Sequence, residues 1–238
     1  MHSIYKRKDS DDLVTLETFD QLEGDDKDIF DFILRLAFTA TVNSKQVFSC
    51  SEKESEGDDN KLGLIVVDRD YVRYGLDEIY TFLHLTFQEY LAACYVARLS
   101  VEFQKQIIQS HGKKKHLAVV WKFYCGMTIF SDKALDNFKL LLSQTESNTL
   151  LHLQCAHESQ QKCTCTHVVQ SKNGEIKLEK ESLNPVDCTA LGYVLINSDV
   201  PVKTMTAMSC HMGPESFAAL VKESGTHSLL IEFLRLVF

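Results

Sequence analysis

The sequence lacks the glycine pattern on which most nucleotide hydrolysis depends. Its 238 residues include ten glycines, and no two of these are spaced as the motif requires. A phosphate-binding loop of the form G-x-x-x-x-G-K-[ST] is therefore absent, together with the backbone N–H groups that would hold the phosphates. The chain also has no apolar strand ending in an acidic pair for magnesium, no Gly-x-Ser-x-Gly elbow and no convincing Cys–His nucleophile pair. We therefore expect that this chain is not an enzyme.

Positive charge and long apolar runs are also scarce. Lysine and arginine number 25 against 33 acidic residues, and the net charge of −8 with no basic stripe argues against nucleic-acid binding. No apolar run reaches the length of about 20 residues needed for a membrane span, and the first residues lack the apolar core of a signal peptide. The eight cysteines are scattered, which is typical of reduced thiols. These features predict a cytoplasmic protein without membrane or nucleic-acid partners.

The most apolar stretch, Ile79 to Ser100, changes period in its middle. Ile79 to Leu85 alternates and is rich in β-branched and aromatic residues, which predicts a strand. The following string Thr-Phe-Gln-Glu, which begins at Thr86, has the form of a capping box. Apolar residues then recur at helical spacing on nearly all sides, which predicts a buried helix. His84 is thus expected at the end of the strand, just before the helix.

The string TFLHLTFQEYLAACY closely resembles the FLHLTFQEFLAA signature of the NACHT-domain NOD-like receptors, signal-transduction NTPases with leucine-rich repeats. That signature ends the winged-helix part of their nucleotide-binding module. In the family, the matching histidine contacts the β-phosphate of bound ADP and helps to hold the closed resting state. The resemblance therefore implies that His84 is a nucleotide-binding residue and that ADP or ATP is the cofactor of the intact receptor. Because the P-loop is missing, neither nucleotide is expected to bind this chain alone.

Residues 1–100 are predicted to form the winged-helix domain. A helical stripe predicts a helix from Asp25 to Val42, and short apolar runs at 47–50 and 62–67 predict strands on either side of an acidic loop. Some winged helices bind DNA through a recognition helix, but the helix after His84 is too apolar and offers almost no cations. Gln88 and Glu89 are expected to serve capping and packing rather than ligand binding.

Residues 101–185 are predicted to form an all-helical domain. Apolar periodicity indicates helices around Ile107, at 117–127, at 135–143 and at 149–160. Two of these strings, HLAVVWKFYCGM and TLLHLQCAHESQ, resemble segments of the second helical domain of the NOD-like receptors. The resemblance implies that this part is the autoinhibitory helical domain.

Residues 186–238 are predicted to hold a transition helix and the first leucine-rich repeat. The string VDCTALGYVL resembles the family segment before the repeats, with Asn184 or Ser182 as its cap and Pro185 at a first helical position. Val202, Met205, Ala207 and Cys210 then fit the template L-x-x-L-x-L-x-x-C. A weaker second match begins at Leu230. Since a repeat normally buries its face on further repeats, the apolar end of the chain favours a truncated receptor.

One group of soft ligands raises the question of zinc. Cys163, Cys165 and His167 follow closely on His152, Cys155 and His157. Zinc sites generally use Cys-x-x-Cys, and the Cys-x-Cys spacing here fits one ion less well. We therefore predict no metal site.

Together these patterns predict a mostly α fold: a winged helix with a small β-sheet, an all-helical domain and the start of an α/β repeat solenoid. The resemblance implies a fragment of a cytosolic NOD-like receptor, a nucleotide-switched scaffold of the innate-immunity or inflammasome type. Its partners would be proteins, through self-oligomerisation and an adaptor bound by domains outside this chain. The alternative is a stand-alone helical and leucine-rich-repeat interaction module with no nucleotide role.

Overall fold

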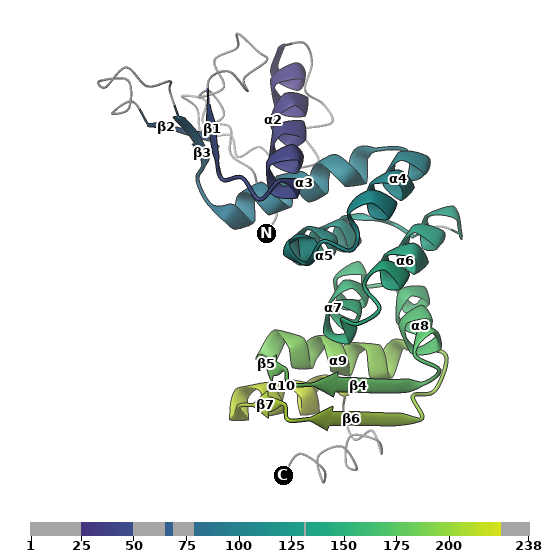
Figure 1. Cartoon of the computed structure of the whole chain (residues 1–238). Helices are drawn as coiled ribbons and strands as arrows, with labels where there is room; N and C mark the ends of the chain where they lie inside the picture. Colours follow the sequence, from purple (N-terminus) through teal and green to yellow (C-terminus); the bar gives the residue numbers. More distant parts are fainter. Residues whose placement is uncertain (1–24, 50–64, 69–78, 131, 225–238) are drawn as a thin grey trace, which may run out of the picture. The chain divides into compact units, whose positions relative to one another are not determined.

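A computed structural model describes residues 25–49, 65–68, 79–130 and 132–224. This part of the chain is mostly helical, with nine α-helices and a few short strands, as the sequence predicts. It divides into two compact units, Met1–Arg98 and Leu99–Phe238, and each is described by itself (Figure 1). No helix in the described ranges is long and apolar enough to cross a membrane.

The first unit holds two helices and a small antiparallel sheet. Helix α2 (Asp25–Val42) and helix α3 (Leu85–Arg98) are joined through strands β1 (Val47–Ser49), β2 (Ile65–Asp68) and β3 (Ile79–Phe82). The strand order is β1-β3-β2, and both neighbours run antiparallel to β3. All five elements lie where the apolar patterns predict them, within a few residues.

Helices α2 and α3 pack through apolar faces at helical spacing. Phe30, Ile33 and Leu34 of α2 are fully buried, as are Leu91 and Val96 of α3. The ring of Phe38 on α2 stacks on the ring of Tyr95 on α3, with the two centroids 5.2 Å apart. The prediction that α3 is a buried helix is therefore confirmed.

The second unit begins with a stack of short helices. These are α4 (Val101–His111), α5 (Ala118–Met127) after a 3-10 turn (Lys115–Leu117), α6 (Asp132–Gln144), α7 (Thr149–Ser159) and α8 (Lys162–Ser171). Aromatic rings fill the space between them: Tyr124 contacts Phe130 edge to face, and Phe130 contacts Phe138 in the same way. Helix α8 contains Cys163, Cys165 and His167, a stretch for which the apolar pattern predicts no helix.

The described part of the second unit ends with two successive strand–strand–helix segments. Strands β4 (Glu175–Glu179) and β5 (Ser182–Leu183) precede helix α9 (Pro185–Asn197), and strands β6 (Thr204–Met208) and β7 (His211–Met212) precede helix α10 (Pro214–Ser224). β4 pairs parallel with β6 and β5 with β7, and Figure 1 shows α9 lying alongside β4 and β6. β4 and β5 lie within 101–185, so the prediction that this whole range is helical is wrong at its end.

Asn184, one of the two residues predicted to cap α9, is its cap. Asn184 Oδ1 accepts hydrogen bonds from the N–H groups of Val186 and Asp187, and Pro185 occupies the first turn. The Asp187 carboxylate accepts from the Asn184 N–H and also from Gln154 Nε2 of α7. The cap therefore fixes the start of α9 and ties it to the helical stack. Val202 and Met205 of the predicted repeat are buried, whereas the predicted match beginning at Leu230 lies outside the described residues.

Candidate functional site

His84 lies at the start of α3 and caps it. Its carbonyl oxygen accepts hydrogen bonds from the N–H groups of Phe87 at 3.0 Å and Gln88 at 3.2 Å. The helix begins at Leu85, so Thr86 lies inside the first turn. The prediction that Thr86 is the N-cap residue of a capping box is therefore wrong by two positions.

The imidazole of His84 is exposed and has one nitrogen engaged. Nδ1 accepts a hydrogen bond from the Thr86 N–H at 3.1 Å, satisfying one of the free donors of the helix N-terminus. In the neutral ring, an accepting Nδ1 places the proton on Nε2. Nε2–H is then the donor that His84 can offer to an acceptor such as a phosphate oxygen. The helix N-terminus beside it also favours negative charge, because its unpaired N–H groups carry partial positive charge.

Gln88 anchors the helix that presents this histidine. Its side chain is 1% exposed, and its amide nitrogen donates to Thr41 Oγ1 at 3.1 Å and to the Lys45 carbonyl at 2.9 Å. Thr41 Oγ1 in turn donates to the Ala37 carbonyl at 2.7 Å. This buried chain of bonds joins the first turn of α3 to the last turns of α2. Gln88 thus serves packing, as predicted, and its partners Thr41 and Lys45 could not be identified from the sequence.

The six cysteine and histidine residues considered for zinc are spread over two helices. Cys163 and Cys165 are two positions apart on α8, so their side chains point about 200° apart around the helix. Cys165 is fully buried and Cys163 partly exposed. Across the described ranges, no three His, Cys, Asp or Glu side chains come close enough to hold a metal ion.

The buried thiols have little nucleophilic character. Burial raises the pKa of Cys94 and of Cys165 to about 12 and that of Cys188 to about 11. Because the thiolate is the reactive form, these cysteines act as small apolar side chains. All seven described cysteines are free thiols.

Comparison of the whole chain with known protein families finds no match, and comparison with curated proteins finds none either. The likeness to the NOD-like receptors therefore stands on the strings of residues around His84, Trp121, His152 and Cys188 alone. The geometry at His84 adds a physical reason to consider a phosphate ligand there.

Proposed function

We propose that this chain is the central-to-late part of a nucleotide-switched signalling scaffold of the NOD-like receptor type. In this proposal a P-loop module elsewhere in the receptor binds ADP, and Nε2–H of His84 donates to the β-phosphate. Exchange of ADP for ATP would remove that contact and release the resting state. The chain would read the nucleotide without hydrolysing it.

The observation that carries the proposal is the exposed imidazole at the start of α3. Its Nδ1 is held by the Thr86 N–H at 3.1 Å, so the ring is oriented before any ligand arrives. The Gln88 bonds to Thr41 and Lys45 hold the helix itself in place. A donor fixed in this way loses little conformational entropy when a phosphate binds.

The order of elements along the second unit, a helical stack followed by strand–helix segments, supports the proposal. The proposal assigns the helices α4 to α8 to an autoinhibitory domain and the two strand–helix segments to the start of a leucine-rich-repeat solenoid. The registers of β4 on β6 and of β5 on β7 share one offset, from Glu175 to Thr204 and from Ser182 to His211. A constant offset between parallel strands is typical of repeat proteins.

Substitution of His84 tests this function in the full-length receptor that contains the chain. We expect His84→Ala and His84→Asn each to weaken ADP binding about tenfold, because each removes a hydrogen bond to a charged phosphate. Asparagine is a good N-cap residue, so His84→Asn keeps the helix capped while losing the imidazole donor. Titration with fluorescent ADP gives the affinities.

A matched control is His116, another exposed histidine, on the 3-10 turn before α5. His116→Ala is expected to bind ADP like the wild type. If His84→Asn also binds like the wild type while His84→Ala is only less stable, His84 is a cap and does not contact the nucleotide.

The alternative function, a protein-interaction module, has its own supporting observation. Several large apolar side chains of the second unit are exposed, among them Ile129 at 86%, Met208 at 62% and Phe103 at 59%. Exposed apolar side chains of this size are common at protein interfaces, although single ones are ordinary. The two functions differ in whether the chain belongs to a protein with a P-loop.

A further inference from the structure

The two strand–strand–helix segments of the second unit repeat one another at a constant offset of 29 residues. The parallel registers place Glu175 opposite Thr204 and Ser182 opposite His211. Helices α9 and α10 begin with prolines at the same offset. The second segment is therefore a structural copy of the first, as in proteins built from stacked repeats.

Backbone conformation and burial repeat at the same offset. Lys180 and Ser209 each lie between the two strands of their segment, and their φ angles of 57° and 55° are left-handed. In the two helices, Leu191 and Leu220 are both buried. The offset therefore describes the turns and the helix cores as well as the strands.

The buried positions on β4 and β6 identify the core face of this small parallel sheet. On β4, Ile176 and Leu178 are 0% and 2% exposed, and the residues on either side of them are exposed. On β6, Met205 is 5% exposed, whereas Ala207, which pairs with Leu178, is only partly buried. The core face is thus closed over β4 and partly open at β6.

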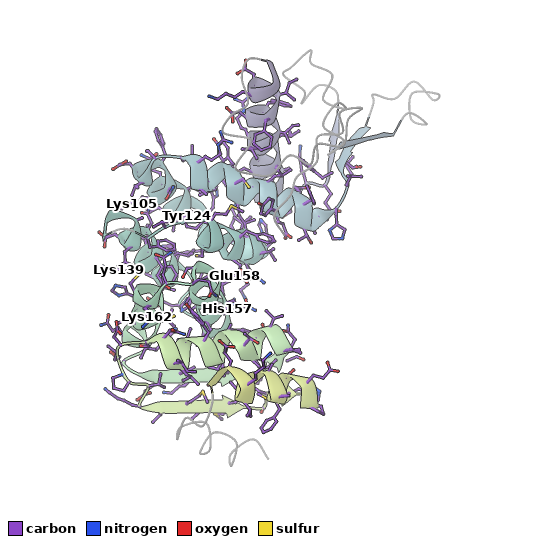
Figure 2. All side chains as sticks on the ribbon, turned by 180° about the vertical axis from the view of Figure 1, so that it is seen from behind. Lys105, Tyr124, Lys139, His157, Glu158 and Lys162 are labelled. Carbon is purple, nitrogen blue, oxygen red and sulfur yellow. The ribbon has the colours of Figure 1, made fainter. Side chains whose placement is uncertain are left out.

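Strand β6 has one edge to which no other described strand is paired. Its other edge is bonded to β4. Figure 1, and Figure 2 from the opposite side, show β6 on the side of β4 that faces away from α7 and α8. An open edge presents backbone N–H and C=O groups to which a further strand can bind. A third repeat would therefore add at this edge.

One more step of the observed offset leads from β6 to residues 233–237, with the sequence FLRLV. Leu234 and Leu236 then take the inward positions found on β4 and β6. Arg235, the one charged residue of the string, takes an outward position. Apolar residues at every second position, with a charge between them, are typical of a half-buried strand.

The observed offset differs by one residue from that of the match that begins at Leu230. Leu230 lies 28 residues after Val202. That spacing would turn Arg235 towards the core and the leucines on either side of it towards solvent, since a shift of one residue moves every side chain to the opposite face. The registers of the two paired segments therefore favour the offset of 29.

We propose that residues 233–237 bind the open edge of β6 as a third parallel strand, with Leu234 and Leu236 facing the core. Helix α10 ends at Ser224, and residues 225–232 form a slightly longer connection than 198–203 between α9 and β6, so the string can reach the edge. This tether gives the string a high effective concentration, which favours it over a second copy of the chain. The proposal rests on the repeat assignment made in the proposed function and not on the role of His84.

Thiol labelling of the full chain tests the proposal. The variants Leu234→Cys and Arg235→Cys introduce a thiol at neighbouring positions, and each is treated with a water-soluble maleimide under native conditions. Mass spectrometry of the digested protein gives the rate at each position and separates it from the native cysteines. We expect the thiol introduced at 234 to react at least about tenfold more slowly than the one at 235, because burial shields a thiol from the reagent. In urea the two rates should be equal.

Three results would contradict the proposal. Faster reaction at 234 than at 235 would show the offset of 28, and equally fast reaction at both would show that the string does not cover β6. Protection at 234 that is lost on dilution would show a second copy as the occupant. Circular dichroism checks that the variants fold, and Leu236→Cys replaces Leu234→Cys if that variant does not. The ADP titrations of the His84 variants depend on none of these results, so the two proposals fail separately.

Discussion

Replacement of Trp121 by alanine is expected to lower the free energy of unfolding of the second unit by about 3–5 kcal/mol, the usual cost of deleting a large buried ring. Trp121 lies on α5 and is fully buried. Its ring contacts that of Tyr124 edge to face at a centroid distance of 6.2 Å, and Tyr124 continues into the aromatic cluster of the stack. The substitution leaves a cavity at the start of this cluster. Urea unfolding followed by circular dichroism measures the change.

Two further variants sharpen this prediction. Trp121→Phe should cost clearly less than Trp121→Ala, because it keeps a ring and removes an Nε1–H that is buried without a partner among the described residues. Phe103→Ala removes an aromatic ring that is 59% exposed and should change stability by less than about 1 kcal/mol. A loss of less than about 1 kcal/mol in Trp121→Ala would contradict the packing described for α5.

Acidification is expected to destabilise the second unit through His152. Its pKa falls from 6.5 to about 4 in the folded chain, first because the ring is buried and second because Lys172 is near. The unfolded chain therefore binds more protons in this interval, and stability falls as the pH drops from 6.5 towards 4. Each pKa unit corresponds to about 1.4 kcal/mol, so the full loss from this residue is about 3 kcal/mol.

His152→Gln isolates this contribution, because glutamine can still hydrogen-bond to Thr145 but does not titrate. We expect its free energy of unfolding to depend less steeply on pH than that of the wild type between 6.5 and 4. Carboxylates and other histidines titrate in both proteins, so only the difference between the two curves is used. Parallel curves would show that His152 has the same pKa in the folded and unfolded chains.

The sequence predicts most helices and strands because their apolar periodicity is local. Helix α2 spans Asp25–Val42 as predicted, and α9 is capped by Asn184, one of the two residues predicted for that place. Helix α8 was not predicted, because its string KCTCTHVVQS is short and rich in residues of low helix propensity. Its buried side chains, among them Cys165 and Val168, show that tertiary packing stabilises it. Strand β4 alternates in burial along EIKLE, a pattern visible in the sequence, but its pairing with β6 is not local.

The sites differ in how much the sequence shows of them. His84 stands out through a string of neighbouring residues, although its role as the helix cap depends on where α3 begins. The Gln88–Thr41 bond, which joins α3 to α2, could not be predicted, because the two residues are far apart in the sequence and meet only through the packing of the two helices.

Sequencing the transcript that encodes this chain, upstream of Met1 and in the same reading frame, tests the proposed receptor role most directly. The proposal predicts that the frame continues upstream and encodes a P-loop of the form G-x-x-x-x-G-K-[ST]. An in-frame stop codon before any such motif would contradict the proposal, because His84 would then have no bound nucleotide to read. That result would favour the protein-interaction module instead.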